Sequence, residues 1–455
     1  MNDHNSLLLK LGPLLYLSRL LLIPVIFILL ITACSQTSEE ASDLELVWEG
    51  WEHIKESYIS LDKLDMEEFN QAIINSILDS TNKPAYPLLK DLDSVRLVPI
   101  RVPGELSDIY KLWSLIKKNN PDMDPNAVVD TALKSMLNSL DEPSAAYLTA
   151  DEYMRSRETL SGNYEGIGAS VGMSNGNIMI LGVMNNSPAQ QSGIKANDII
   201  KRIGNTSVEG YTVDETVDLV RGPKGSKVSI TLERDQGTEV ITEIIRGNID
   251  VPTIDVHLLP GAVGYIAIGA FSEHTGDEFS EALQELMSVD TLALIIDLRN
   301  NLGGSIESGL DISSQLLSKN LFIFELDRSL VRKDWIVKKD RTAPVNVPLA
   351  ILVNELTSST AEAVAASLQD HERAIIIGMP TIGQGSSNEF LELSDGSAFY
   401  VPVSNWFTPS GKSIHGIGIE PDIPVQLNQD DLLSGRDTQL IEAYQYLDKL
   451  LPAFQ

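Results

Sequence analysis

The 455-residue sequence predicts an α/β domain in its C-terminal part, preceded by a small β-rich domain and by a helical region. The short apolar runs Leu349–Val353 and 374–377 are typical of strands buried on both faces of a sheet. Between these two runs, apolar residues recur at helical spacing over 361–368. Alternation in Lys227–Arg234 indicates a strand of the smaller domain, and amphipathic patterns before residue 141 indicate helices.

Composition places the chain among globular proteins of two or three domains, because 43% of its residues are apolar and 22% are charged. The formal net charge of −30 argues against nucleic acid as a ligand and disfavours binding to anionic lipid through the protein surface. Metal-ligand spacings, phosphate-binding loops and redox motifs do not occur in the sequence. We therefore expect neither a metal nor a cofactor.

Residues 1–34 have the pattern of a targeting segment. Lys10 and Arg19 supply positive charge, residues 20–33 form an apolar run, and Ile-Thr-Ala precedes Cys34. The run is short for a membrane span, which needs about 20 residues. Small residues before a lone cysteine resemble the bacterial lipobox, which implies cleavage and acylation at Cys34 and a membrane-tethered lipoprotein in the periplasm or on the cell surface. The alternative is an uncleaved anchor helix.

Two helical pairs are expected after this segment. Residues 35–105 would hold a tether and the first pair, with helices at 46–58 and 66–78. Residues 106–160 would hold the second pair, whose helices at 107–118 and 125–140 are again separated by a polar loop. The common order indicates an internal repeat, and convergent amphipathic helices are the alternative.

Residues 161–250 carry an ordered set of short motifs. The run Gly166-Ile167-Gly168-Ala169 is followed by Ser-Pro-Ala, by Gly-Ile-Lys-Ala-Asn-Asp-Ile-Ile and by a helix at 212–220. This order of motifs resembles a PDZ domain. The two glycines allow consecutive backbone N–H groups to turn toward one point, where they would bind the terminal carboxylate of a peptide that adds a strand to the sheet. These four residues are therefore the predicted peptide-binding site, and the basic turn at 221–225 is either a solvated loop or a contact to the tail or the core.

The remaining residues, 251–455, carry three motifs of an α/β core with a closing helix at 437–451. They read Asp-Leu-Arg-Asn-Asn-Leu-Gly-Gly at 297–304, Thr-Ser-Ser-Thr-Ala-Glu at 357–362 and Thr-Ile-Gly-Gln-Gly-Ser-Ser-Asn at 381–388. These motifs resemble D-L-R-x-N-x-G-G, S-A-S-A-S-E and T-F-G-K-G-x-x-Q of the carboxy-terminal processing, or tail-specific, serine proteases. The segment 140–148 resembles the D-P-x-S-x-Y-L segment of the same family. The resemblance implies a tail-specific protease core of the ClpP/crotonase-like α/β class.

The same resemblance assigns roles to individual residues. The nucleophile falls on Ser359, and the oxyanion donors fall on Gly303 or Gly304 and on Thr360. The general-base lysine of the family is replaced by Gln384, and its supporting glutamine is replaced by Asn388.

Gln384 is the main departure from the family, because an amide does not accept a proton near neutral pH as a desolvated lysine does. His415, His371 and Lys412 are the alternative bases that we consider. Two functions follow: a serine peptidase that recognises and cleaves C-terminal tails of extracytoplasmic proteins, or a pseudoprotease that binds tails as an adaptor or scaffold. We also expect the charged segment 322–346 to be an irregular excursion over the site.

Overall fold

The computed structural model describes residues 42–81, 89–161, 163–174, 176–184, 186–234, 237–318, 320–338, 345–427 and 435–451. The predicted targeting segment, Cys34 and the tether up to residue 41 lie outside these described residues. Within the described ranges, no helix has both the length and the apolar character that crossing a membrane requires. The chain divides into two compact units, the first of 1–153, 327–331 and 387–404 and the second of the remaining residues.

The first unit is helical, and its two predicted helical pairs share one hydrophobic core. The helices are α2 (Glu45–Ser57), α3 (Met66–Ser80), α5 (Ser107–Asn119) and α6 (Pro125–Asn138). Asp65 and Asp124 cap α3 and α6 by accepting hydrogen bonds from backbone N–H groups of the first turn. Trp51, Phe69 and Trp113 are fully buried between the helices. The two pairs therefore form one folding unit, with a core that neither pair could supply alone.

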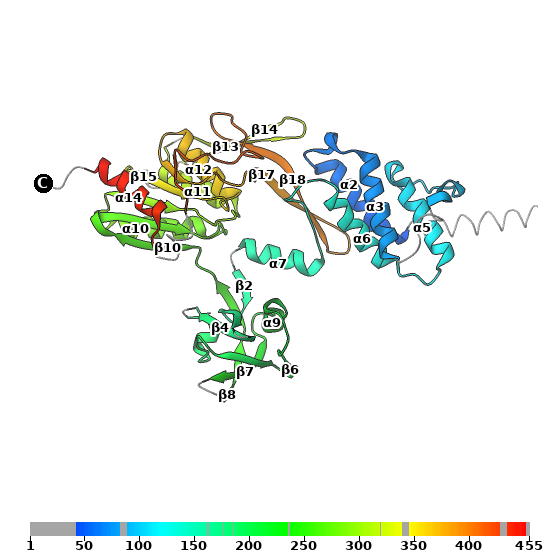
Figure 1. Ribbon diagram of the computed structural model, residues 1–455, viewed down its shortest axis with the longest axis horizontal. Helices are drawn as coiled ribbons and strands as arrows, with labels where there is room; N and C mark the ends of the chain where they lie inside the picture. The colour runs from blue at the N-terminus through cyan, green and yellow to red at the C-terminus, as the bar shows by residue number, and fades with distance from the viewer. Residues whose placement is uncertain are drawn as a thin grey trace, which may run out of the picture. The chain divides into compact units, whose positions relative to one another are not determined.

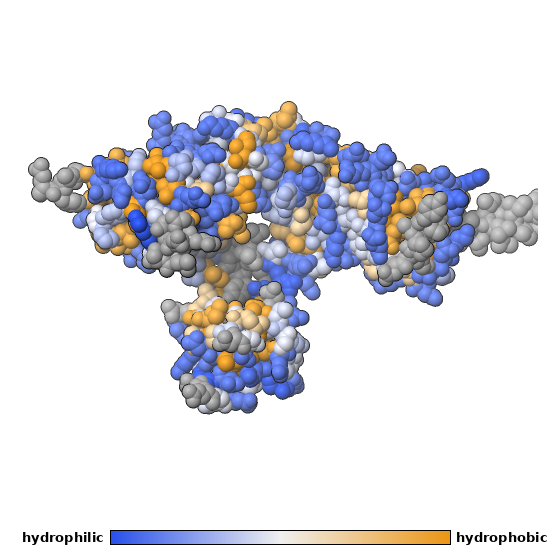
Figure 2. All heavy atoms as spheres, viewed as in Figure 1, coloured by the Kyte–Doolittle hydropathy of each residue, from blue (hydrophilic) through white to orange (hydrophobic). Residues whose placement is uncertain are grey.

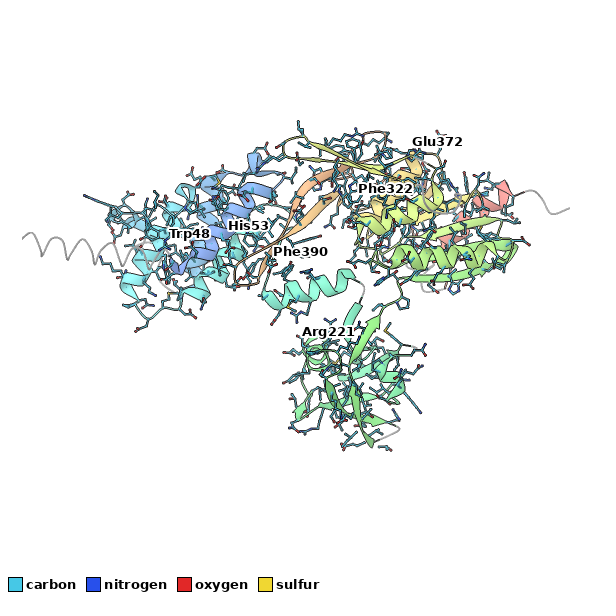
Figure 3. All side chains as sticks on the ribbon, turned by 180° about the vertical axis from the view of Figure 1, so that it is seen from behind. Trp48, His53, Arg221, Phe322, Glu372 and Phe390 are labelled. Atoms are coloured by element: carbon cyan, nitrogen blue, oxygen red, sulfur yellow. The ribbon has the colours of Figure 1, made fainter. Side chains whose placement is uncertain are left out.

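A β-hairpin from the middle of the C-terminal region completes this helical unit (Figure 1). Its strands are β17 (Ser386–Glu392) and β18 (Ala398–Phe407), and β1 (Ala146–Leu148) pairs antiparallel with β18. Phe399 lies in the same core as the helices, and a Cβ at Gly50 of α2 would be 2.8 Å from its ring. Phe390, labelled in Figure 3, packs on Tyr400 with ring centroids 4.7 Å apart. Sequence patterns did not indicate that the hairpin belongs to this unit.

The small β-domain follows α7 (Ala150–Ser161) and has a sheet in the order β3-β4-β5-β7-β8, with β6 beside β5 and with β2 paired to β9. Its core consists of aliphatic residues such as Ile180, Ile200, Ile230 and Leu232. Its elements are β2 (Asn163–Gly166), β3 (Ala169–Ser174), β4 (Asn177–Val183), α8 (Pro188–Gln191), β5 (Ile199–Ile203), β6 (Thr206–Ser207), α9 (Val213–Val220), β7 (Lys227–Arg234), β8 (Thr238–Ile245) and β9 (Gly247–Asp250).

The α/β core is built on a sheet in the order β10-β11-β12-β15-β16-β19, which is parallel except for the β10–β11 pair. Helices α10, α11 and α12 share one apolar cluster with the sheet, and α14 shares a separate cluster with it. The strands are β10 (Ile254–Leu259), β11 (Val263–Ile268), β12 (Ala293–Asp297), β15 (Leu349–Val353), β16 (Ile375–Gly378) and β19 (Ile423–Pro424). The helices are α10 (Thr275–Met287), α11 (Ile306–Leu316), α12 (Thr360–Asp370) and α14 (Thr438–Leu450).

The expectation of irregular structure at 322–346 is wrong for the described part of this segment. Strands β13 (Leu321–Asp327) and β14 (Arg332–Ile336) form an antiparallel pair. The charges that suggested a loop are cross-strand neighbours, since Lys333 lies opposite Glu325 at 2.8 Å and Arg332 stacks on a phenylalanine ring. Residues 339–344 lie outside the described residues.

Candidate active site

The turn between β15 and α12 holds Ser359 in a strained backbone conformation. Its φ of 56° and ψ of −122° lie in a region that residues other than glycine rarely adopt, at a cost of about 1–3 kcal/mol. Thr357, Ser358 and Thr360 on the same turn are buried, whereas Ser359 is partly exposed. A sharp strand-to-helix turn that lifts one serine out of the surface is the geometry of a nucleophile elbow. The backbone thus singles out Ser359 among its neighbouring hydroxyls.

The glycine pair that follows β12 lies against this turn. A Cβ at Gly303 would be 2.6 Å from the Cβ of Ser359 and 3.0 Å from its Oγ, so the backbone of Gly303 touches the serine side chain. Thr360 Oγ1 donates to the carbonyl oxygen of Gly304 at 2.8 Å. The structure therefore brings together all four predicted residues of the nucleophile and the oxyanion hole.

The hydrogen bonds favour Gly304 over Gly303 as an oxyanion donor. The N–H of Gly303 already donates to Asn301 Oδ1 at 2.8 Å. Within the described residues, the N–H groups of Gly304 and Thr360 make no hydrogen bond, and that of Thr360 belongs to the first turn of α12. Free backbone N–H groups on the turn of a serine nucleophile and on the loop packed against it can stabilise an oxyanion in acyl transfer.

Glu362 fixes the turn against the loop that carries Gln384. Its carboxylate is fully buried and accepts four hydrogen bonds. Ser359 N–H (2.9 Å) and Gln384 N–H (2.8 Å) donate to Oε2, and Gly383 N–H (2.7 Å) and the Thr381 hydroxyl donate to Oε1. Burial raises the pKa of Glu362, and these donors lower it, with a net direction upward. Sequence reasoning used this glutamate only to locate the nucleophile three residues before it.

Gln384 does not contact the predicted nucleophile. Its Oε1 accepts a hydrogen bond from Ser358 Oγ at 2.8 Å, and Ser358 is buried. Asn388 lies in the helical unit, where its side-chain amide donates to the carbonyl oxygen of Ser144 at 3.3 Å. This bond connects the predicted supporting position to the segment 140–148. The structure therefore ties each of the two altered positions to a serine other than Ser359.

Two of the three alternative bases lie away from the nucleophile. His371 is the C-cap of α12, so it is roughly 18 Å along the helix from Ser359, and its Nε2 is 2.8 Å from the carbonyl oxygen of Leu321. Lys412 is exposed and lies 4.0 Å from Asp370 at the same end of the helix. The loop of His415, by contrast, packs on the Gln384 loop. A Cβ at Gly385 would be 2.5 Å from the His415 backbone N, and Gly416 N–H donates to Gly383 at 2.8 Å.

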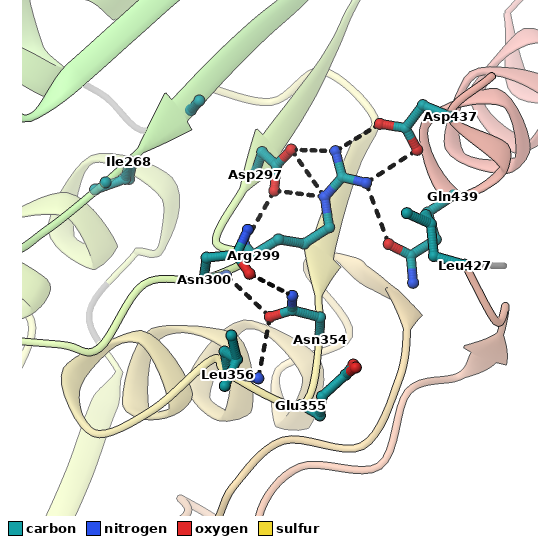
Figure 4. Close-up of a pocket in the computed structure, with 12 residues that line it drawn as sticks. Ile268, Asp297, Arg299, Asn300, Asn354, Glu355, Leu356, Leu427, Asp437 and Gln439 are labelled. Atoms are coloured by element: carbon teal, nitrogen blue, oxygen red, sulfur yellow. Dashed lines mark hydrogen bonds and ion pairs between the residues drawn. The ribbon is translucent and has the colours of Figure 1, made fainter. Parts of the chain in front are cut away.

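A polar network at the carboxyl ends of the strands holds the oxyanion loop and α14 in place (Figure 4). Arg299 donates to Asp297 from Nε (2.9 Å) and to Asp437 from Nη1 (2.9 Å) and Nη2 (2.7 Å). Asn300 and Asn354 exchange two hydrogen bonds of 2.9 Å, which link the oxyanion loop to the nucleophile turn. Arg299 also lines a pocket of about 520 Å³ beside this network, but all N–H groups of its guanidinium already donate to side chains of the protein.

The small β-domain has a separate groove of about 300 Å³. All four predicted peptide-binding residues, Gly166 to Ala169, line it together with Ile180, Ile200, Val213, Val217 and Val220. In the described part of the domain, the N–H groups of Ile167 and Gly168 have no backbone partner, while their carbonyls accept from Ala189 and Met184. Arg221, which follows α9, also lines the groove (Figure 3), and Figure 2 shows apolar side chains on the visible face of this domain.

Comparison with known proteins agrees with this architecture. Residues 262–425 match the family described as peptidase family S41, and residues 179–234 match the PDZ domain family. The chain is 34% identical over 304 residues to carboxy-terminal processing protease CtpA of Bacillus subtilis (strain 168), which covers 67% of this chain and 65% of CtpA. It is 30% identical over 373 residues to CtpB of the same organism, which covers 80% of this chain and 75% of CtpB.

Among solved structures, the photosystem II D1 C-terminal processing protease aligns with a TM-score of 0.47 and 23% identity, over 85% of this chain and 93% of that one. The two matched families lie within the β-domain and the α/β core. The chain belongs to peptidase family S41, the carboxy-terminal processing proteases, and carries a PDZ domain ahead of its peptidase core.

Proposed function

We propose that this protein is a serine-type peptidase that binds the C-terminal tails of extracytoplasmic proteins in its PDZ groove and cleaves them at Ser359. The observation that carries the proposal is the strained turn at Ser359 beside the free N–H groups of Gly304 and Thr360. Ser359 Oγ would attack the scissile carbonyl, and the two N–H groups would stabilise the oxyanion. Electrostatic stabilisation of this kind supplies much of the rate enhancement in acyl transfer.

Proton transfer is the step that this site handles differently from its family. Gln384 neither accepts the Ser359 proton nor delivers a proton to the leaving amine. In a serine protease, loss of the base reduces turnover by about 10⁶-fold and leaves residual catalysis from binding and the oxyanion hole. His415 is the base we propose for any activity of the native chain, since its loop packs on the loop of Gln384.

A pseudoprotease that holds tails as an adaptor or scaffold is the second candidate function. One observation favours it: the Gln384 side chain accepts a hydrogen bond from Ser358, so it supports the fold of the turn and makes no hydrogen bond with Ser359. The PDZ groove would serve this function without any change.

Labelling with a fluorophosphonate probe separates the two functions. For a peptidase we expect the native chain to react and to cleave a tail peptide, Ser359→Ala to abolish both, and His415→Ala to reduce both. Ser288→Ala, at an exposed serine after α10, is the matched control. For a pseudoprotease the native chain stays unlabelled, and Gln384→Lys restores labelling and cleavage.

Tail binding is tested by calorimetry with one peptide in two forms. A free C-terminal carboxylate would accept hydrogen bonds from Ile167 and Gly168, and an amidated terminus would not. We expect the amidated peptide to bind at least 10-fold more weakly, and equal affinities would rule out the carboxylate cradle.

Anchoring through a lipid on Cys34 is the remaining part of the proposal, and the lipobox-like run before this cysteine supports it. Cys34→Ser is expected to move the protein from the membrane fraction to the soluble fraction of the extracytoplasmic space. An uncleaved anchor helix would instead keep the variant in the membrane fraction.

A further inference from the structure

The linker between the two helical pairs exposes an apolar run. Leu97 is 67% exposed and Ile100 is fully exposed, with Val98 between them at 36%. The run is well held, because Val95 and Val102 on its two sides pack into the core of the helical unit. A turn closes over Ile100, since the N–H of Val102 donates to the carbonyl oxygen of Pro99 at 3.1 Å. The 96–101 loop therefore presents three aliphatic side chains outward from a fixed backbone, although the helices beside it bury theirs.

This loop lies at the end of the unit where the chain leads back to Cys34. Arg101 forms an ion pair with Glu45 at 3.4 Å, and Glu45 is the first residue of α2. Only residues 35–41 separate Cys34 from the first described residue, Ser42. A chain of that length spans at most about 28 Å when fully extended. A lipid on Cys34 would therefore keep this end of the helical unit close to the bilayer surface.

The charge around the loop also suits a lipid surface. The chain as a whole has a net charge of −30, but residues 89–106 contain three cations (Lys90, Arg96, Arg101) and three anions (Asp91, Asp93, Glu105), so their net charge is zero. Arg96 and Arg101 stand at the two ends of the apolar run. Arg101 is paired with Glu45, whereas a side chain such as that of Arg96 can lay its stem on apolar surface and reach with its guanidinium group toward lipid headgroups.

We propose that the 96–101 loop is a membrane contact that inserts Leu97, Val98 and Ile100 into the headgroup region beside the lipid anchor. The inference rests on the anchor proposed at Cys34. The loop would fix which face of the helical unit is turned toward the bilayer.

The test uses the full-length, lipidated protein in vesicles of phosphatidylethanolamine and phosphatidylglycerol. Cys34 is the only cysteine in the chain, so acylation would leave an introduced cysteine as the single reactive thiol. Ile100→Cys is labelled with an environment-sensitive nitrobenzoxadiazole dye. Ile241→Cys, at a residue of the PDZ domain that is 72% exposed, is the matched control. We expect at least a twofold rise in emission at position 100, quenched by spin-labelled lipid, and no change at position 241.

Three other outcomes would overturn the proposal, and they are distinguishable. If the protein floats with the vesicles and the label at position 100 is not quenched, the anchor stands and the loop contact is wrong. If the protein does not float, both the anchor and the contact are wrong. If emission rises with protein concentration without quenching by lipid, the loop binds a second copy of the chain.

Discussion

Glu362→Gln tests whether the buried carboxylate holds the nucleophile turn and the Gln384 loop together. An amide has one acceptor oxygen, whereas Glu362 accepts from four donors on two oxygens. In the better orientation the amide oxygen still accepts hydrogen bonds from the N–H groups of Ser359 and Gln384. The amide NH₂ then faces the other two partners: the Thr381 hydroxyl turns to accept a hydrogen bond from it, and the N–H of Gly383 is left unpaired. The orientation that exchanges the two atoms leaves two backbone N–H groups unpaired.

The expected loss of stability follows from this count. One buried, unpaired N–H costs about 1–3 kcal/mol, and each of the two retained bonds loses about 1 kcal/mol when its acceptor becomes neutral. Replacing the carboxylate by a neutral amide also removes the cost of burying a charge, the same cost that raises the pKa of Glu362, and this offsets part of the lost stability. We expect a net loss of about 2–4 kcal/mol in the free energy of unfolding. Denaturant unfolding near pH 7 measures it, with Glu372→Gln, at an exposed residue just beyond the opposite end of α12, as the control (Figure 3).

A pH series provides a second test of the same carboxylate. The folded-state pKa of Glu362 lies above the ordinary value of 4.5, so its contribution to stability is fully present below that value and is lost as pH rises through the folded pKa. The glutamine variant lacks this dependence. The stability gap between the two proteins should therefore be wider near pH 4 than near pH 8. A loss no larger than that of the Glu372→Gln control, or a gap that widens with pH, would refute the reasoning.

Three further substitutions probe the site and its supports. Gly304→Ala would place a Cβ against the backbone carbonyl oxygen of Phe271, at a φ of +133°, so the free energy of unfolding should fall by about 3 kcal/mol. Gly104→Ala is the control, because Gly104 has open space around it, and it should change that free energy by no more than about 0.5 kcal/mol. Val217→Asp puts a charge into the apolar PDZ groove, and calorimetry should show at least a 10-fold loss of tail affinity. Arg299→Lys cannot pair with both carboxylates in bidentate geometry, so thermal unfolding should show a loss of about 2–4 kcal/mol. Burial raises the pKa of Asp437, but the hydrogen bonds and charge of Arg299 lower it, and the net direction is downward, so its contribution to stability is lost as pH falls below 3.8. Acid titration should show this loss in the native protein and a smaller one in the variant, because lysine keeps the charge and makes fewer hydrogen bonds.

Sequence patterns predicted the elements whose signal is local. The run Leu349–Val353 forms a strand with those bounds, and the residues at helical spacing over 361–368 lie in α12. Family motifs then located Ser359, the glycine pair and Thr360, and the structure brings these residues together. Their catalytic roles stay predictions. The choice between the two glycines needed the hydrogen bond from Gly303 to Asn301, which no sequence pattern contains.

Features that depend on distant contacts were not accessible from sequence. Helix α11 buries serines at 308, 313 and 314, so its pattern reads as polar although the helix lies in the core. The charged pattern of β13 and β14 predicts a loop, because the charges neutralise one another only across the strand pair. The fourfold role of Glu362 depends on donors up to 22 residues away in sequence. A glutamate in a helical first turn gives no sign of this role before the fold is known.

The β17–β18 hairpin limits how this protein can be divided. Residues 387–404 follow the Gln384 loop directly, yet their apolar side chains complete the core of the helices at the other end of the chain. A fragment that starts at the PDZ domain would keep Leu393, Phe399 and Val401 and lose the helices whose buried side chains share their core. The N-terminal helices expressed alone would lack the ring that fills the space beside Gly50. Neither fragment is a self-sufficient domain, so a deletion within the first 150 residues acts on the same cooperative unit as a mutation near residue 400.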